Sequence, residues 1–323
     1  MTALTFGVFI PQGWKMELAG LPTPQEKWAK SVEIAQLAED LGFDSLWVYD
    51  HVHNVPKPAG EAVFEAWTTL AAISQRTERI MLGQMVGCAP YRNPALLAKI
   101  TANIDVISGG RLIWGIGAGW YRNEFAGYGY DFASPADRIR AMAETVEIVT
   151  GLWKEPSFSY QGRYFTLDRA QCDPKPLQDR PQVLIGGGGE QLTLRVVARL
   201  ADAANFGGNP EQFAHKCEVL KGHCKDLGRD YDTIAKTWAP DLYLRESEAA
   251  LHAENITSLW GEDFESWQAG NLVGTVEQVT EKIVEYVRLG CTGFYPWCRD
   301  YPETRSMTLF AETVIPEVRR LVG

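Results

Sequence analysis

The residues best suited to acid–base chemistry follow a short apolar run, SLWVY, near the start of the chain. Asp50 and His51 come directly after it, and His53 stands two positions further on. Because histidine titrates near neutral pH, His51 can carry a proton in alcohol–carbonyl chemistry. A histidine that only hydrogen-bonds a loop is an equal alternative. Asp50 would point to the opposite side and fix a cofactor ring or a backbone turn.

Glu124 is the other acid within reach of this position, because it stands just beyond the strand-like run RLIWGI. It is a candidate catalytic acid or base. Capping of a helix N-terminus explains it equally well, since the helix dipole favours acids in a first turn. His215, His223 and His252 lie on predicted helices and are assigned to the surface or to packing, and no metal-binding constellation emerges.

A run of four glycines, from Gly186 to Gly189, stands between a predicted strand and a predicted helix. Free N–H groups at a helix start bind phosphate, and glycines let the phosphate approach the backbone. Gln191 and Thr193 can add side-chain donors. A tight turn without a ligand is the alternative. A second cluster, GIGAG at 115–119, is only a weak signal for a dinucleotide because it does not open the first strand–helix unit.

Predicted strands alternate with predicted helices along the whole chain, and the fold that they form determines where the candidate site residues lie. Such a pattern implies parallel strands, and about eight units favour a closed (β/α)8 TIM barrel with its site at the carboxyl ends of the strands. The predicted units are 5–10 with 24–41, 45–49 with 64–74, 80–86 with 94–107, 111–116 with 136–152, 182–185 with 190–200, 203–206 with 210–227, 236–244 with 276–289, and 293–297 with a helix ending near 322.

Two segments fit no strand–helix unit. Residues 158–167 predict a hairpin about Gln161-Gly162, and residues 245–272 have no clear pattern. Both are expected to be insertions over the active face, at the C-terminal face of the strands. The whole chain, 1–323, is expected to form one α/β domain.

The amino-acid composition argues against several classes of function. The chain has 46% hydrophobic residues, enough for a large core, and its net charge of −10 argues against a general affinity for nucleic acid or anionic membranes. It lacks a membrane-length apolar run and a signal peptide pattern, so a cytoplasmic location is expected. Six cysteines without a CxxC pair are expected to be mostly reduced and structural.

The sequence also resembles a known family. The run SGGRLIWGIGAGW (108–120), followed by NEF (123–125), closely resembles the signature of the luciferase-like monooxygenase superfamily. AEDLGFDSLWVYDH (38–51), FEAWTTLAAISQRTERIMLG (64–83) and VGTVEQV (273–279) also resemble it in order and spacing. Within the superfamily, the pattern is similar to the branch of oxidoreductases that use the deazaflavin coenzyme F420. The resemblance implies a TIM barrel with the cofactor ring in its mouth.

The resemblance implies a role for individual residues. Asp50 and His51 would lie beside the ring, with His51 at the proton-transfer position of family dehydrogenases. Val55 and Trp120 depart from those dehydrogenases, which have a tryptophan and an acid there, and this leaves the substrate open. The bulged end of the third strand, often a non-prolyl cis peptide in the family, would be formed by Val86, Gly87 and Cys88. The cofactor contacts would be Gly117, Ala118, Gly119 and Asn123. The phosphate loop would consist of Gly187, Gly188, Gly189 and Gln191.

Three functions are compatible with these residues. The first is reversible hydride transfer between C5 of F420 and a small carbonyl, alcohol, imine or activated alkene, with His51 as proton donor or acceptor. The second is a two-component monooxygenase using FMNH₂ from a partner reductase, and the third is a non-catalytic flavin-binding protein. An intact His51 and a complete glycine run count against the third.

The resemblance further implies partners. A flavin or F420 reductase would supply reduced cofactor, and the acidic polyglutamate tail of F420 would prefer basic residues at the pocket rim. The family often forms homodimers through its second and third helices. Trp67, Leu70, Ile100 and Ile104 are candidate contributors, and packing onto the barrel is their alternative role.

Overall fold

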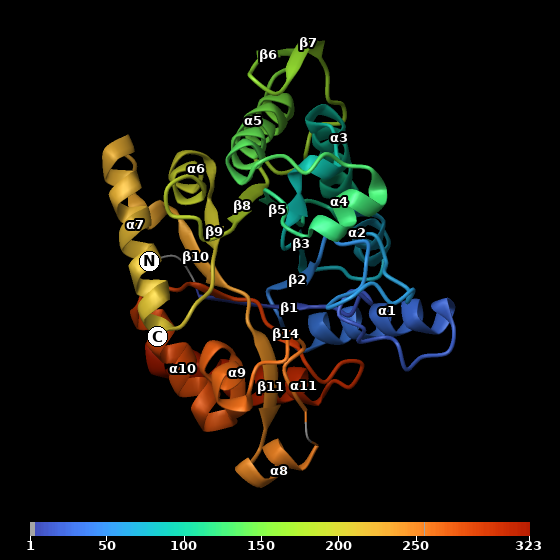
Figure 1. The fold of residues 1–323 in the computed structure, drawn as a ribbon, viewed down its shortest axis with the longest axis vertical. Helices are drawn as coiled ribbons and strands as arrows, with labels where there is room; N and C mark the ends of the chain where they lie inside the picture. Colours follow the sequence, from blue (N-terminus) through green and yellow to red (C-terminus); the bar gives the residue numbers. More distant parts are fainter. Residues whose placement is uncertain (1–3, 255) are drawn as a thin grey trace.

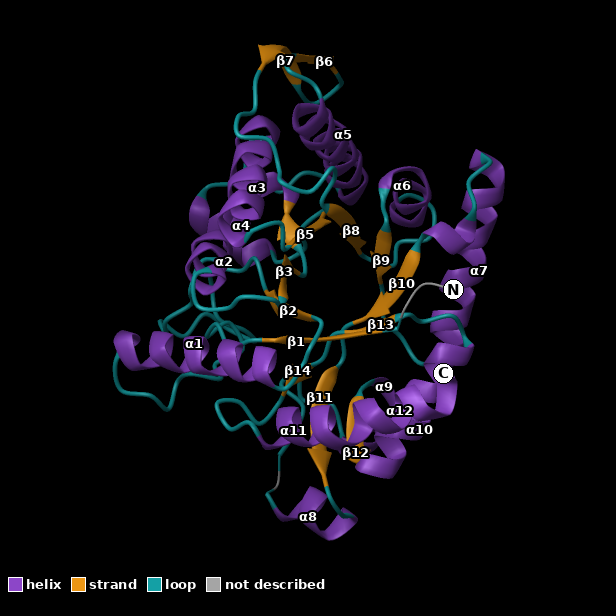
Figure 2. Ribbon diagram, turned by 180° about the vertical axis from the view of Figure 1, so that it is seen from behind, coloured by secondary structure: helices purple, strands orange, loops and turns teal. Residues whose placement is uncertain are grey.

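Eight parallel strands close on themselves at the centre of the molecule, with helices around them (Figures 1 and 2). The computed structural model describes residues 4–254 and 256–323. Pairing of β3 with β5, and of β1 with β13, closes the ring, which confirms the predicted barrel. Its strands are β1 (Thr5–Phe9), β2 (Ser45–Val48), β3 (Met81–Gln84), β5 (Leu112–Gly117), β8 (Gln182–Gly186), β9 (Ala203–Asn205), β10 (Ala235–Trp238) and β13 (Gly293–Phe294).

The surrounding helices begin and end close to their predicted bounds because their caps are encoded locally. Thr23, Asn93, Ser134 and Asn209 accept backbone N–H groups at four helix starts, each with proline in the first turn. The helices are α1 (Pro24–Asp40), α2 (Ala66–Ser74), α3 (Pro94–Ser108), α5 (Pro135–Lys154), α6 (Thr193–Leu200), α7 (Pro210–Leu227), α10 (Val276–Arg288), and α11 (Arg305–Leu309) joined by a π-helical turn (Phe310–Val314) to α12 (Ile315–Val322).

The predicted strand at 236–244 is right only for its first residues, because the chain leaves the barrel at Pro240. Proline has no N–H for a central strand ladder. Strand β10 ends before it, and β11 (Asp241–Arg245) joins a separate parallel sheet with β12 (Leu272–Thr275) and β14 (Trp297–Cys298). Helices α8 (Glu248–Ala253) and α9 (Phe264–Gly270) lie between β11 and β12 along the chain. Residues 245–272, which fit no predicted strand–helix unit, thus belong to an insertion that follows the carboxyl end of β10.

The predicted hairpin is present as β6 (Phe158–Gln161) and β7 (Thr166–Ala170), but it does not cover the barrel mouth. It lies beside α5 (Figure 1). Glu144 of α5 accepts the backbone N–H groups of Arg163 at 2.8 Å and Tyr164 at 3.0 Å, and the Tyr164 hydroxyl donates to Asp137 at 2.6 Å. The expected position over the active face is therefore wrong, and only the hairpin tip reaches the first turn of α5.

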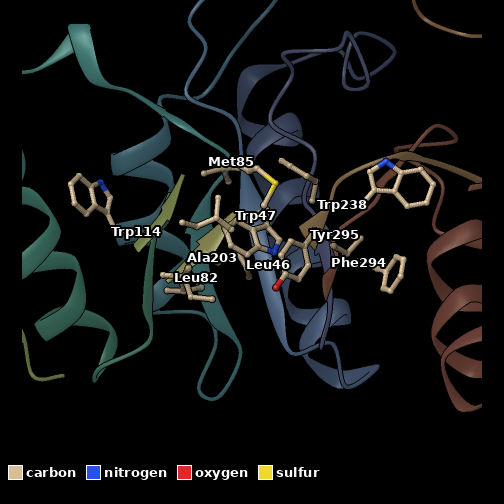
Figure 3. Close-up of a cluster of buried hydrophobic side chains, with 14 of the residues drawn as sticks. Leu46, Trp47, Leu82, Met85, Trp114, Ala203, Trp238, Phe294 and Tyr295 are labelled. Carbon is tan, nitrogen blue, oxygen red and sulfur yellow. The ribbon is translucent and has the colours of Figure 1, made fainter. Parts of the chain in front are cut away.

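Trp47 fills the interior of the barrel because its neighbouring strands provide room for it (Figure 3). A Cβ atom on Gly83 would lie 2.4 Å from the Trp47 ring, and one on Gly7 would lie 2.6 Å from Trp47 Nε1. Trp47 packs against Tyr295 with 4.7 Å between ring centroids and donates to Ser45 Oγ at 2.9 Å. The barrel is a packed core below its mouth, as close packing of interiors requires.

Three of the four residues proposed for a dimer contact are buried inside this chain. Trp67, Leu70 and Ile104 are at most 5% exposed, so they pack onto the barrel and cannot form an outer surface; Ile100 is partly buried. All six cysteines are buried free thiols. Among the described helices, none has the length and apolar character needed to cross a membrane.

Candidate active site

His51 lies three residues beyond β2 in a box of aromatic rings. Its ring stacks on Trp14 with 4.1 Å between centroids and an interplanar angle of 2°. Trp120 and Tyr121 contact it edge-on at 5.7 and 6.0 Å. The His51 Nδ1 atom lies 2.7 Å from Glu124 Oε2. Stacking and pairing together hold the imidazole in one orientation, with Nε2 as the nitrogen not engaged by Glu124.

Glu124 is fully buried behind His51, on the short helix α4 (Arg122–Tyr128). Its Oε1 accepts the backbone N–H groups of Val52 at 2.7 Å and His53 at 3.0 Å, and its Oε2 also accepts the Tyr91 hydroxyl at 2.8 Å. Burial, the largest influence, raises its pKa, but the hydrogen bond and charge of His51 and the two N–H groups outweigh burial and lower the pKa overall. The side chain is a carboxylate that binds four donors, rather than a helix cap.

Asp50 points away from His51 into a second ion pair. Arg92 donates to its two oxygens at 2.6 and 3.0 Å, and the backbone N–H of Cys88 donates to it at 2.8 Å. Arg92 also pairs with Glu65 at 2.7 Å. Asp50 therefore fixes the backbone after β3, which is the second of the two roles expected for it.

Val86 lies at the centre of the barrel mouth. The expected non-prolyl cis peptide is present, between Met85 and Val86, and the short strand β4 (Gly87–Cys88) then pairs with β5. A Cβ atom on Gly117 of β5 would lie 2.5 Å from Val86 Cγ2, and one on Gly186 of β8 would lie 2.8 Å from Val86 Cγ1. Glycines on both neighbouring strands thus leave space that the Val86 side chain occupies.

Two cavities adjoin at Val86. The first, of about 170 Å³, has walls from the His51 box together with Asp50, Val86 and Cys88, and no lysine or arginine lines it. The second, of about 310 Å³, extends from Val86 to the glycine run. They share four lining residues: Met85, Val86, Gly119 and Trp120. Together they form one cleft at the carboxyl ends of the strands, the position expected for a barrel site.

The far end of the larger cavity has the chemistry of an anion site. Gly187, Thr193 at the start of α6, Asn205 at the end of β9 and Arg138 of α5 line it. Helix α6 begins without a side-chain cap. Gly187 has φ of +125°, a backbone conformation that side chains disfavour. These donors, together with the helix dipole, suit a phosphate group.

Each cavity also has a buried donor without a hydrogen-bond partner among the described residues. Trp14 Nε1 is unpaired beside His51, and Arg138 Nε is unpaired beside the glycine run. Unpaired buried donors are costly, at about 1–3 kcal/mol each, unless a ligand binds them. The aromatic walls at His51 and the donors beside the glycine run together fit an elongated ligand with a ring system at one end and an anion at the other.

The structure brings most of the predicted site residues to this cleft and leaves the others near it. The residues that line the cleft are Asp50, His51, Val86, Cys88, Gly117, Ala118, Gly119 and Gly187. Glu124 acts from behind His51, and Gly87 is buried in the strand. Asn123 is exposed on α4, and Gly188, Gly189 and Gln191 lie beside the cavity without lining it.

Several lining residues were not predicted. Trp14 and Asn205 stand at or just after barrel strands, so the rule that selected His51 could have found them. Tyr91 is in the short turn after β4 and reaches Glu124 through its hydroxyl. Arg138 lies on a helix and carries no local signal, because only the folding of α5 against the mouth brings it to the cavity.

The site thus combines a closed parallel barrel, a histidine paired with a buried carboxylate, and a cleft with donors suited to an anion. The luciferase-like monooxygenase family model matches residues 4–264. The chain belongs to the luciferase-like monooxygenase family and is an oxidoreductase.

Relatives and solved structures agree with this assignment. An F420-dependent glucose-6-phosphate dehydrogenase of Amycolatopsis mediterranei (strain U-32) is 33% identical over 319 residues, covering 90% of this chain and 94% of its own. The structure of an F420-dependent secondary alcohol dehydrogenase is 19% identical with a TM-score of 0.81, covering 98% and 99% of the two chains. EDTA monooxygenase of Chelativorans sp. BNC1 is 17% identical with a TM-score of 0.82, covering 99% and 94%. The two solved structures share the barrel fold.

Proposed function

We propose that the protein is an F420-dependent oxidoreductase acting on a small uncharged carbonyl, alcohol, imine or activated alkene. The observation that carries the proposal is the His51–Glu124 pair, which adjoins a cleft that ends in an anion site. The 33% identical relative named for F420 supports the choice of cofactor. The absence of lysine and arginine from the described lining of the His51 cavity supports an uncharged substrate rather than a sugar phosphate.

The residues of the cleft fit a deazaflavin. Val86 and the strand-end glycines Gly117 and Gly119 would hold the ring, and Gly187 with Thr193 would hold the phosphate. When bound, F420 supplies or accepts a hydride at C5. The aromatic walls exclude water from the reacting groups.

His51 is proposed to move the proton at the substrate oxygen or carbon. Because Nδ1 lies against the Glu124 carboxylate, Nδ1 carries a hydrogen and Nε2 is the atom that takes or gives the substrate proton. Glu124 stabilises the charged imidazole that forms when Nε2 accepts a proton. Glu124 is therefore a positioning residue, not a proton carrier, because it lines neither cavity.

Cofactor titration tests the proposed function. The protein is expected to bind F420 at micromolar concentration or below, and FMN at least about tenfold more weakly, a difference of about 1.4 kcal/mol. Both ligands offer a tricycle and a ribityl phosphate to the cleft, but only F420 carries an acidic tail beyond the phosphate. Quenching of cofactor fluorescence measures both affinities. Tight binding of FMN without binding of F420 would instead support the two-component monooxygenase.

The glycine run gives a second prediction, at Gly187. Gly187→Ala is expected to weaken F420 binding about tenfold or more, because alanine at φ of +125° costs about 1–3 kcal/mol and shifts the cavity wall. Gly188→Ala is the matched control. Its φ is not in the left-handed region, and an added Cβ meets only the flexible end of Lys216, at 2.9 Å from Cε. Equal affinities for the two variants would contradict a phosphate at Gly187.

A further inference from the structure

A third cavity, of about 520 Å³, continues from the anion site along the outside of the barrel. It is lined by residues of α5, α6 and the β6–β7 hairpin, and in Figure 1 the hairpin and α6 lie on either side of α5. Ile139 of α5 lines both this cavity and the anion cavity, so the two adjoin. We call it the arginine groove, after the four arginines that line it: Arg140, Arg163, Arg195 and Arg199.

The acidic side chains of the arginine groove are already bound to donors of the protein. Glu144 accepts the backbone N–H groups at the hairpin tip, at 2.8, 3.0 and 3.1 Å. Glu147 accepts the Tyr160 hydroxyl and pairs with Arg199 at 3.0 Å. Neither carboxylate is free to bind a cation from solution.

Two of the arginines have only weak partners, and one has none. Arg140 and Arg163 both approach Asp137, at the long distances of 3.7 and 3.5 Å. Arg195 forms no ion pair with any described residue, and it stands two positions after Thr193 of the anion site. In a chain with a net charge of −10, this is a local excess of positive charge directly beyond the place proposed for the phosphate.

We propose that the arginine groove binds the oligoglutamate tail of F420. The inference rests on the proposed function, because the tail follows the cofactor phosphate and the groove begins where the anion cavity ends. Carboxylates spaced along a flexible chain match guanidinium groups carried by two helices and a hairpin. Arg195 of α6 and Arg163 of the hairpin would be the main contacts, because neither has a strong ion-pair partner among the described residues.

Titration with F420 forms of different tail length tests this inference. We expect the form with two glutamates to bind about fivefold more tightly than the form that keeps the phosphate but has no glutamate, the scale of a few exposed charge pairs. The difference should shrink in high salt, which screens exposed charges. The readout is Kd from fluorescence quenching, which needs no turnover.

Variants of the groove sharpen the test. Arg163→Gln with Arg195→Gln is expected to bring the Kd of the tailed form to that of the tail-free form, whose own Kd stays unchanged. The control is Arg169→Gln, on the same hairpin but outside the groove; among the described residues, the Arg169 side chain forms an ion pair only with its neighbour Asp168. Equal Kd values for all tail lengths, or an equal loss in the control, would overturn the inference while leaving the proposed function intact. Failure of every F420 form to bind, with or without glutamates, would overturn both.

Discussion

His51→Asn is expected to lower turnover by about 10²- to 10⁴-fold, the usual contribution of general acid–base catalysis. Asparagine keeps a polar side chain near the cleft but cannot carry a proton near neutral pH. The affinity for F420 should change little, because the anion site and Val86 are untouched. A loss of turnover at constant Kd separates chemistry from binding.

The measurement begins with a screen of F420H₂ oxidation over ketones, aldehydes, imines and conjugated enones, and of F420 reduction by alcohols. Glucose 6-phosphate belongs in the second screen as the charged comparison. The control is His53→Asn, because His53 lies two residues away, contacts Tyr128 and lines neither cavity. If His51→Asn kept most of the activity that His53→Asn keeps, His51 would not be the proton carrier.

Glu124→Gln is expected to lower turnover by about 10- to 100-fold and to destabilise the fold by about 1–3 kcal/mol. Four donors point at the carboxylate, and an amide can accept at only one of its two ends. One pair of donors therefore loses its acceptor. Measurement of kcat and of urea unfolding at neutral pH gives the two effects.

The pH dependence of stability distinguishes a charged Glu124 from a structural role alone. Because its pKa is lowered in the fold, its contribution is present above the unfolded pKa of glutamate, about 4.3, and is lost as pH falls through the folded value. The free energy of unfolding of the wild type should thus fall in acid by more than that of Glu124→Gln. Parallel pH profiles would contradict a carboxylate held by His51. Glu33→Gln, at an exposed carboxylate of α1 that pairs with Lys30, is the control.

The barrel was predictable because its signals are local. Thr23 and Asn209 are the N-caps of α1 and α7, so each lies directly at the helix start that it determines. The strands are short apolar runs that can likewise be recognised from neighbouring residues. The same holds for His51 and the glycine run, which follow strand ends. The predicted strand at 236–244 was too long, because a hydrophobic pattern continues on both sides of Pro240 while the chain changes sheets there.

The rest of the site depends on contacts between distant residues. The role of Glu124 rests on a pairing with His51 across 73 positions, and Arg138 enters the cleft through the packing of α5. Asp50 accepts hydrogen bonds from Arg92 and from the Cys88 backbone N–H, and no local sequence pattern indicates these partners. Side-chain partners of this kind depend on tertiary geometry, whereas strand and helix positions depend mainly on neighbouring residues.

Because Val86 fits closely against Gly117 and Gly186, the side-chain sizes at these three positions depend on one another. Any side chain added at either glycine would occupy volume that the valine methyl groups already fill, on strands that are central to the barrel. A homologous chain with a larger residue at 117 or 186 must carry a smaller one than valine at 86. We therefore expect positions 86, 117 and 186 to change together when the floor of this cleft diverges.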